Sequence, residues 1–413
     1  MNRIRLPLRP DKRLDWSITM QDNWLPFHRP SIGQEELLAM KEVLESRWLT
    51  TGPVTQRFER AFASFVDCRY AVAVSSCTAA LQLALDAIGI NAGDEVLVPS
   101  YTFAATAGAV IYRGARPVLC DSVPGGFNID PIDAAGRITA KTRAIIAVHI
   151  AGEPCNLQAL RQLAERHSIH LIEDAAHALP ASHAGRRVGS ISEITAFSFY
   201  ATKTITTGEG GMLTTNDEAY ARRASMMRLH GIGGDAWKRY SNQGSWYYEI
   251  VDAGIKANMP DVLAALGLAQ LRKAEAFHMR RCEIADLYLR RFSDVEELEM
   301  PPAGDENSIH SWHLFILRLR PEMLAIGRND LINHLKQAGI GTSVHFIPLH
   351  LHPYYQDRYG YRFGDFPCAE DAYTRCLSLP IYPDMTEADV ERVVASVKRL
   401  LQRNPRSMPV CAD

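Results

Sequence analysis

Short apolar runs alternate with helical patterns between residues 70 and 176, and this alternation constrains the fold more than any other feature of the sequence. The runs are AVAVSS, EVLVPS, RPVLCD, RAIIAVHI and HLIEDAA, with helical patterns such as TAALQLALDAI between them. Continuous apolar strands separated by helices are typical of βαβ units and of a mostly parallel sheet buried on both faces. We therefore predict an α/β fold. Two further runs, AFSFYAT and GMLTT, close the region, and we expect them to pair antiparallel.

The remaining sequence predicts an N-terminal extension and a second domain. Apolar residues recur at helical spacing over 261–289 and predict one long helix that connects to the second domain. Beyond residue 290, WHLFILRL and TSVHFI are predicted strands, whereas RNDLINHLKQAG and TEADVERVVASVKRLL are predicted helices. We assign 1–24 to the extension, 25–275 to a large domain and 276–413 to a smaller α+β domain. Ser31, with Glu35 and Glu36, predicts a capped helix over 34–46.

Composition and charge argue against several classes of function. The 413-residue chain is 47% hydrophobic and 22% charged, and its formal charge is −2 without a long run of one sign. We therefore expect no nucleic-acid partner and no binding to a membrane surface. The N-terminus lacks the apolar core of a signal peptide, and no apolar stretch approaches the roughly 20 residues of a membrane span. Eight cysteines without a C-x-x-C pair indicate free thiols, so we predict a cytoplasmic protein.

Polar groups follow three of the predicted strands, and ligands bind at the carboxyl ends of strands in open α/β sheets. The first group is VSSCTAA, residues 74–80, where a strand leads into a helix through small and hydroxyl residues. Free N–H groups at a helix start, together with the helix dipole and the Thr78 hydroxyl, suit a phosphate. An ordinary N-cap explains the same residues, and this stretch alone leaves both interpretations open.

The second strand end, IEDAAH, carries Asp174 and, three residues later, His177. A carboxylate at this place can hold a protonated ring nitrogen, and a histidine can form a hydrogen bond with a neighbouring phenolic oxygen. A structural aspartate and a core histidine remain the alternative.

The third strand end, FSFYATKTITTGEGGM, places Lys203 between an apolar strand and a turn rich in threonine and glycine. Burial weakens the preference of a lysine for its charged form, which suits it to Schiff-base formation, although a surface lysine on a hairpin explains this stretch equally well. Ser198 lies upstream on the strand, and GEGG does not match the phosphate-binding pattern G-x-G-x-x-G. A phosphate site, an acid for a ring nitrogen and a deeply placed lysine together predict pyridoxal phosphate.

A metal site is a competing interpretation of His345, His350 and His352, which lie close together in the sequence. Pro348 and Pro353 interrupt regular structure there, and no carboxylate lies at ligand spacing. We predict that the protein binds no metal and that these histidines support a loop or contact substrate.

These stretches resemble the DegT/StrS family of nucleotide-sugar aminotransferases, which are pyridoxal phosphate enzymes of the aspartate aminotransferase fold (fold type I). The resemblance runs from LPFHRP to ERVVASV. Its markers are WLTTGP, SSCTAALQLAL, GDEVLVPSYTF, GARPVLCD, IEDAAHA, FSFYATKTITTGEGGM, NMPDVLAALGLAQL and SLPIYPDMT. The resemblance implies that Lys203 forms the Schiff base and carries a proton between cofactor and substrate, that Asp174 keeps the ring nitrogen protonated, and that His177 contacts the ring oxygen.

The resemblance also implies the remaining cofactor contacts. Thr78, Ser198 and the amides near Cys77 and Ala79 would hold the phosphate, and the Phe103 ring would stack on the cofactor. Asn258, in KANMPD, matches an asparagine that reaches the phosphate from a neighbouring subunit, which implies a homodimer with shared active sites.

Three features distinguish this chain within the family. Cys77 replaces the usual glycine or alanine and is expected to narrow the pocket. His177 replaces the glutamine of many members and, like the insertion at 230–251, favours the branch of sugar 4-aminotransferases. Lys203 is retained, whereas the dehydratase members of the family carry histidine there.

The resemblance implies an aminotransferase that moves an amino group from L-glutamate to a nucleotide-linked keto sugar, with a 4-keto sugar expected. The expected substrate contacts, each of which could equally be a structural residue, are His230, His313, His345 and Tyr354. The alternatives are an enzyme of the same fold and cofactor that acts on a 3-keto sugar, a cyclitol or an amino-acid ketone, and a non-catalytic regulatory relative.

Overall fold

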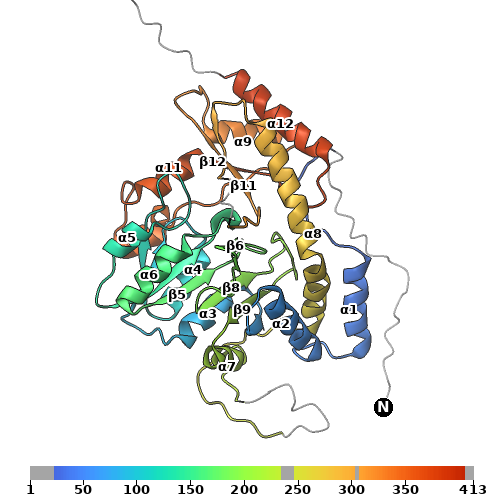
Figure 1. The fold of residues 1–413 in the computed structure, drawn as a ribbon, viewed down its shortest axis with the longest axis vertical. Helices are drawn as coiled ribbons and strands as arrows, with labels where there is room; N and C mark the ends of the chain where they lie inside the picture. Colours follow the sequence, from blue (N-terminus) through green and yellow to red (C-terminus); the bar gives the residue numbers. More distant parts are fainter. Residues whose placement is uncertain (1–22, 234–245, 303–306, 405–413) are drawn as a thin grey trace, which may run out of the picture.

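The computed structural model describes residues 23–233, 246–302 and 307–404. Figure 1 shows an α/β body in its lower part, a smaller group of C-terminal elements above it, and the long helix α8 (Asp261–Arg291) that runs through both. The predicted extension, residues 1–24, lies almost entirely outside the described residues.

Within the described ranges, seven strands form the central sheet in the order β1-β9-β8-β5-β4-β2-β3. The strands are β1 (Tyr70–Val74), β2 (Glu95–Pro99), β3 (Arg116–Cys120), β4 (Thr142–Val148), β5 (His170–Asp174), β8 (Ile194–Ser198) and β9 (Gly211–Thr215). Those from β8 to β3 pair in parallel, whereas β9 pairs antiparallel with both of its neighbours. The predicted mostly parallel sheet and the antiparallel pairing of AFSFYAT with GMLTT are therefore confirmed.

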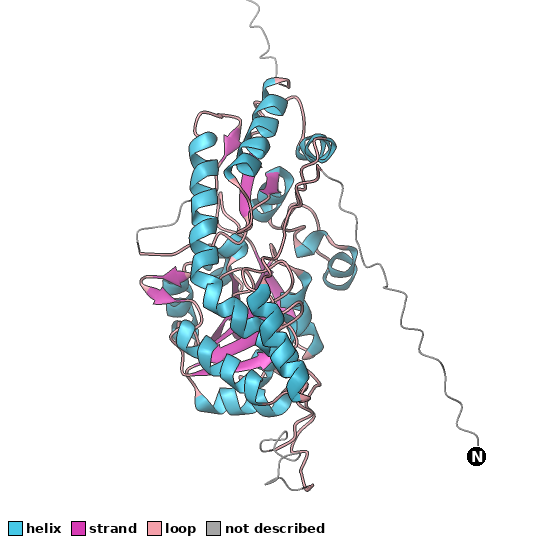
Figure 2. Ribbon diagram, turned by 90° about the vertical axis from the view of Figure 1, so that its right-hand side faces the viewer, coloured by secondary structure: helices cyan, strands magenta, loops and turns pink. Residues whose placement is uncertain are grey.

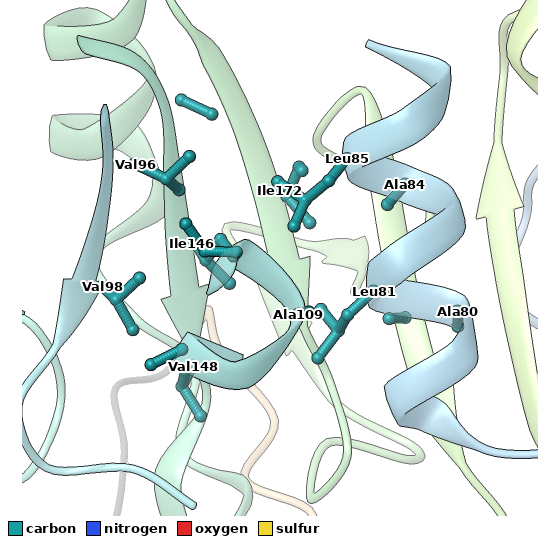
Figure 3. Packing of buried hydrophobic residues seen from close by; sticks show 14 of the residues in the cluster. Ala80, Leu81, Ala84, Leu85, Val96, Val98, Ala109, Ile146, Val148 and Ile172 are labelled. Carbon is teal, nitrogen blue, oxygen red and sulfur yellow. The ribbon is translucent and has the colours of Figure 1, made fainter. Parts of the chain in front are cut away.

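Apolar residues cover both faces of this sheet. Alternate strand residues such as Val96, Ile146 and Ile172 pack against α3 (Cys77–Ala87) and α4 (Ala104–Tyr112), as Figure 3 shows. Their neighbours, such as Leu97 and Ile145, face α5 (Pro131–Gly136) and α6 (Leu157–His167) on the other side. Side chains of successive strand residues point to opposite faces, so a sheet with helices on both sides needs continuous apolar strands. Figure 2 shows the strands between layers of helices.

Further helices complete the body, and a second, smaller sheet lies among the C-terminal elements. The additional helices of the body are α1 (Gln34–Ser46), α2 (Pro53–Phe65) and α7 (Glu218–Met227), with a short 3-10 turn at Ile150–Gly152 and a two-stranded ribbon of β6 (Ser182–His183) and β7 (Arg186–Arg187). The second sheet is antiparallel and consists of β10 (Leu298–Glu299), β11 (Phe315–Leu319) and β12 (Cys376–Leu379). Around it lie α9 (Arg328–Gln337), the 3-10 turn Leu349–Leu351, α10 (Pro353–Tyr359), α11 (Pro367–Arg375) and α12 (Glu387–Gln402).

Helix α8 contributes to two hydrophobic cores. Ala264, Leu271 and Phe277 pack in a core with α2 and the β1-β9-β8 edge, whereas Ile284 and Tyr288 pack with β11 and α12. The predicted boundary at residue 275 thus falls inside an unbroken helix, close to the point where its packing partners change. The division into domains stays a prediction.

Two local predictions were wrong. TSVHFI forms no strand, since its backbone makes only a single bridge, between Ser343 and Ser378. The Tyr101 hydroxyl donates to His345 O, and His345 Nδ1 bonds Ser378 Oγ. These side-chain bonds take the place of a regular strand ladder. Helix α1 has its predicted bounds, but its cap is not Ser31. The Gly33 N–H donates to Glu36 Oε2 at 2.8 Å, so a carboxylate in the first turn satisfies the end of the helix.

None of the helices in the described ranges is long and apolar enough to span a membrane.

Candidate active site

A cavity of about 610 Å³ lies at the carboxyl ends of β5 and β8, where the start of α3 meets the C-terminal elements. One side, which we call the strand-end wall, consists of Ser76, Cys77, Thr78, Asp174, Ser198 and Lys203. The opposite side, the C-terminal wall, consists of His313, Leu314, Ser343, His345, Phe346 and Ile381. Residues from three predicted strand ends and from two predicted substrate segments therefore meet in one place.

Asp174 ends β5 and is held in a defined position on the strand-end wall. Its side chain is buried, and its Oδ2 accepts a hydrogen bond from Thr106 Oγ1 at 2.8 Å while Oδ1 accepts from the Ala176 N–H at 3.2 Å. Burial raises the pKa of Asp174, and the two donors partly oppose this because they stabilise the carboxylate. The carboxylate is thus fixed in direction and strongly favours a cationic partner.

Lys203 follows β8 and lines the same wall. Its backbone N–H donates to Tyr200 O at 2.9 Å, which forms a tight turn directly after the strand. Burial lowers the pKa of Lys203 to about 8, against the opposing influence of Cys77 and Asp174. At neutral pH a larger fraction of this amine is therefore unprotonated than of an exposed lysine, and the unprotonated form is the one that acts as a nucleophile or proton acceptor.

The start of α3 offers backbone amides to the cavity, and Ser76 caps this helix. Ser76 Oγ accepts from the Ala79 N–H at 3.1 Å, so the predicted use of the Ala79 amide for phosphate competes with an existing cap. The N-cap interpretation of this stretch therefore holds, and the amides of Cys77 and Thr78 remain without an intramolecular acceptor among the described residues. Gly211 permits the close packing here, because an added Cβ would lie 2.6 Å from the Cys77 nitrogen.

Cys77 lies close to the carboxylate, since its Sγ is 3.8 Å from Asp174 Oδ1. Burial and the charge of Asp174 raise the pKa of Cys77 well above the ordinary value, so the thiol is protonated. The side chain therefore lines the cavity as a neutral group, and the narrowing of the pocket stays a prediction.

Two buried imidazoles, His177 and His313, lie next to each other; His313 lines the cavity, whereas His177, three residues after the end of β5, lies outside the lining. Their ring centroids are 4.4 Å apart, and the Nδ1 atom of each has no hydrogen-bond partner among the described residues. Burial lowers both pKa values well below the usual range, and the nearby charge of Lys203 adds to this in both cases. Both rings are neutral at physiological pH. The His177 ring also stacks on Phe346, with 5.7 Å between centroids.

Further aromatic side chains line the cavity mouth. His345 Nδ1 and Ser378 Oγ are 2.9 Å apart, its ring stacks on Phe27, and burial lowers its pKa to about 4. Phe103 lines the cavity opposite Phe346, with 5.8 Å between ring centroids, and 62% of its surface is exposed in the single chain.

Some predicted site residues lie elsewhere in the chain. His230 is exposed, with its N–H bonded to Ile255 O, and Tyr354 packs its half-exposed ring against Tyr355; neither lines the cavity. Asn258 also lies outside it: its Nδ2 donates to Thr51 Oγ1 at 2.6 Å and its Oδ1 accepts from Lys256. Substrate contact by His230 and Tyr354, and phosphate contact by Asn258, stay predictions.

The histidines weighed as metal ligands have other partners. His350 is buried between Glu370, at 2.8 Å from its Nε2, and Ser100, at 3.3 Å from its Nδ1. His352 directly precedes α10, so His350 and His352 do not share the face of a strand.

Thr106 and His28 belong to the site but were not predicted from the sequence. Thr106 is the hydroxyl that orients Asp174, and a single threonine inside the apolar helix AATAGAVIY is the signal that could have indicated it. His28 lines the cavity with a buried Nε2 that has no partner among the described residues, and burial lowers its pKa to about 3. No periodicity in LPFHRP marks this residue.

The residues present fit pyridoxal phosphate. The cavity has a buried carboxylate suited to a ring N–H, a lysine amine of lowered pKa, unpaired amides at a helix start suited to a phosphate, and unpartnered imidazole nitrogens suited to a ring oxygen. Few other ligands need all four groups in one cavity.

Comparisons with known proteins agree with this chemistry. The sequence profile of the DegT/DnrJ/EryC1/StrS aminotransferase family matches residues 30–398. The chain is 46% identical over 386 residues to the spore coat polysaccharide biosynthesis protein SpsC of Bacillus subtilis (strain 168), an alignment that covers 93% of this chain and 99% of SpsC.

Solved structures are also similar. Spr1654 of Streptococcus pneumoniae in its PMP form has a TM-score of 0.87 and 32% identity, covering 92% of this chain and 99% of that one, and its PLP form has a TM-score of 0.86. DesI, in the presence of its TDP-sugar product, has a TM-score of 0.83 and 29% identity, covering 93% of this chain and 94% of DesI.

Proposed function

Because this chain belongs to the DegT/DnrJ/EryC1/StrS aminotransferase family, we propose that it moves an amino group from L-glutamate to the 4-keto group of a nucleotide-linked sugar. It is an enzyme, a sugar aminotransferase, and pyridoxal phosphate is its cofactor. The observation that carries the proposal is the cavity itself, which unites Lys203 and Asp174 on one wall with neutral imidazoles on the other.

The strand-end wall accounts for the proton transfer. Bound pyridoxal phosphate supplies an electron sink for the substrate carbon that gains or loses a proton. Asp174 would hold the ring nitrogen, with its carboxylate directed by Thr106 and the Ala176 N–H. Lys203, with a pKa lowered to about 8, can both accept a proton from the substrate carbon and return it.

The same wall would bind the phosphate and orient the ring. The amides of Cys77 and Thr78, at the positive end of α3, would face the phosphate, with the Thr78 and Ser198 hydroxyls beside them. Phe103 would lie on the ring face and His177 beside the ring oxygen. The aromatic side chains at the mouth, Phe27 and Phe346, limit the access of water to the reacting atoms.

The proposed substrate class is supported by the relatives and by the composition of the C-terminal wall. DesI is described with a TDP-sugar product, and SpsC takes part in polysaccharide biosynthesis. A wall of neutral donor and acceptor groups such as His313, Ser343 and His345 suits sugar hydroxyls, which both donate and accept hydrogen bonds.

The test is to convert the enzyme to its pyridoxamine form with L-glutamate and then to offer a panel of nucleotide-linked 4-keto and 3-keto sugars, a keto cyclitol and 2-oxo acids. We expect a 4-keto sugar to regenerate the aldehyde absorption fastest, with product identified by mass and NMR. Amination at carbon 3 would move the proposal to the alternative sugar position. Turnover of only the cyclitol or the oxo acids would contradict a sugar substrate.

We further propose a homodimer in which Asn258 reaches the phosphate of the partner subunit. Asn258 adjoins the end of β1 through its bridge to Val74, close to the phosphate-binding turn, yet lies outside the cavity of its own chain. Large apolar side chains that line the cavity, including Phe103 and Tyr200, are exposed in the single chain, as expected if a partner subunit covers them.

Mixed dimers distinguish a shared site from a self-contained one. Lys203→Ala and Asn258→Ala subunits are combined by denaturation and refolding and assayed at limiting cofactor. If Asn258 acts across the interface, one site of each mixed dimer carries both intact residues and activity reappears. If both residues serve the same chain, every site keeps one lesion and no activity returns.

The cellular location is proposed to be the cytoplasm. All cysteines in the described ranges are free thiols, which supports the predicted reducing compartment.

A further inference from the structure

Arg281 on α8 is a buried cation without a carboxylate partner. Its side chain is fully buried, its Nε and Nη2 atoms have no hydrogen-bond partner, and no ion pair joins it to an acid in the part of the chain that the structure describes. Burial lowers its pKa to about 10, so the guanidinium is still charged at neutral pH. Buried charges are normally paired because desolvation is costly, so an unpaired one needs an explanation beyond stability.

The bonded nitrogen of Arg281 holds two segments of the C-terminal wall. Its Nη1 donates to Trp312 O and His313 O, both at 3.2 Å, and to Ile381 O at 2.8 Å. His313 and Ile381 both line the cavity. Trp312 has a φ of +50°, a left-handed conformation that is unfavourable for a side chain of this size and persists only where surrounding contacts impose it.

The same turn is fixed from its other side by the α/β body. The Ser311 N–H donates to Gly152 O at 3.0 Å and the Leu314 N–H to Ala151 O at 3.2 Å. Ser311 Oγ donates to His177 O at 2.5 Å. Residues 311–314 therefore connect the C-terminal wall to the α/β body, and Arg281 bonds the carbonyls of both Trp312 and His313 from the other side.

We propose that Arg281 is a positioning residue of the aminotransferase reaction: it holds the turn at 311–314 so that the His313 ring faces the cavity beside His177, ready to bond the substrate. The inference rests on the proposed function, since His313 matters only if the cavity binds a substrate with hydrogen-bonding groups. This role explains why the fold keeps a buried guanidinium whose Nε and Nη2 atoms make no hydrogen bond among the described residues.

The charge of Arg281 also acts on the imidazoles. The ionisable groups that face His313 are His177, Lys203, Arg281 and His28, and after burial each of them lowers the pKa of His313. Arg281 and Lys203 likewise lower the pKa of His28, which also meets the Tyr382 ring edge-on. A neutral His313 keeps one donor and one acceptor for a hydroxyl group of the substrate, whereas a protonated ring has no acceptor.

Three variants of the cofactor-loaded enzyme test the role: Arg281→Met, Arg281→Lys and the matched control Tyr288→Phe. Tyr288 lies two turns further along α8, is fully buried, and its hydroxyl donates to Pro380 O at 2.9 Å, so its loss removes a bond between α8 and the wall without touching His313. The titration of histidines is followed by NMR on protein labelled at histidine, with His313 assigned by its absence in His313→Gln.

We expect Arg281→Met to raise the pKa of His313, to shift the acidic limb of the kcat/KM profile to higher pH, and to raise KM for the keto sugar about tenfold. Arg281→Lys, which keeps the charge, should leave the pKa of His313 close to its value in the unaltered enzyme. Tyr288→Phe should change neither the pKa of His313 nor the kinetic constants. An unchanged His313 titration in Arg281→Met, or an equal change in Tyr288→Phe, would overturn the proposal.

A double variant excludes a merely structural effect. If Arg281 acts through His313, adding Arg281→Met to His313→Gln should lower kcat/KM by less than a further twofold, whereas independent losses would multiply. If Arg281→Met does not fold, Arg281→Lys becomes the deciding variant. A lysine keeps the positive charge but cannot make all the hydrogen bonds of the guanidinium to the turn, so KM should rise while the pKa of His313 stays unchanged. Failure of the unaltered enzyme to aminate any keto sugar would contradict the proposed function, while the His313 titration would still report on Arg281.

Discussion

The two walls of the cavity differ in how their polar groups are satisfied. On the strand-end wall, Asp174 accepts bonds from Thr106 and the Ala176 N–H, and Ser76 caps α3. On the C-terminal wall, His313 has a buried nitrogen that finds no partner among the described residues, and Arg281, which bonds this wall, has two. The bonded carboxylate has one fixed direction, whereas the unpaired imidazole is available to a ligand; the free amides of Cys77 and Thr78 on the first wall suit the phosphate. We therefore assign chemistry to the first wall and substrate recognition to the second.

Substitution of Lys203 should produce the largest effect on the strand-end wall. Lys203→Ala is expected to lower kcat by about 10³-fold or more, because the amine that would move the proton is lost, while the cofactor still binds noncovalently. Turnover and cofactor absorption are measured together, with the exposed Lys141→Ala as a control that should behave as the unaltered enzyme. Full turnover in Lys203→Ala would refute the assignment of this wall.

Asp174→Asn should lower kcat by about 10²-fold with the fold intact, because an amide cannot stabilise a protonated ring nitrogen as a carboxylate does. The matched control is Asp86→Asn. Asp86 is a mostly buried aspartate that pairs with Arg113 and Arg223 away from the cavity, so this change should cost about 2 kcal/mol of stability and leave kcat unchanged. Kinetics and thermal unfolding of both variants provide the comparison; a near-normal rate for Asp174→Asn would remove the electron-sink argument.

On the C-terminal wall, His313→Gln should raise KM for the keto sugar about tenfold, with little change in kcat and in the affinity for the cofactor. KM should change without kcat because His313 is proposed to bond the substrate equally in the ground state and in the transition state. Steady-state kinetics and a cofactor titration measure it. A large fall in kcat with unchanged KM would place His313 with the chemical groups and abolish the distinction between the walls.

The smallest expected effect concerns Thr106, which tunes the strand-end wall without touching the substrate. The Thr106 hydroxyl stabilises the charged form of Asp174 and so lowers its pKa; Thr106→Val should therefore raise that pKa and move the acidic limb of the kcat profile to higher pH. A pH-rate profile of the two proteins shows the shift. Movement to lower pH would contradict the role given to this hydroxyl.

The two walls also differ in how far the sequence predicted them. Asp174 and Lys203 could be predicted because parallel strands bring their carboxyl ends to one edge, so polar residues after apolar runs meet in space. The C-terminal wall comes from segments without regular periodicity. TSVHFI has a strand-like pattern, yet side-chain bonds from Tyr101 and His345 replace its ladder.

Two polar residues at or behind the cavity, Arg281 and His28, carried no signal in the sequence, unlike His313 and His345 of the C-terminal wall. Arg281 stands in the run HMRRCE, where an arginine on a helix suggests a solvated face, and only the packing of α8 against residues 312 and 381 buries it. His28 precedes the first helix in an irregular segment. Tertiary contacts, which a single sequence does not disclose, decide the role of both residues.

The central claim is that Lys203 is the lysine that holds pyridoxal phosphate in this cavity. The most direct measurement is to treat the cofactor-loaded protein with borohydride, digest it and locate the phosphopyridoxyl group by mass spectrometry. The account predicts that the group is attached to Lys203 in nearly all of the modified protein, and that Lys203→Ala carries none. Attachment mainly to another lysine, such as Lys256 or Lys273, or no attachment despite bound cofactor, would contradict it.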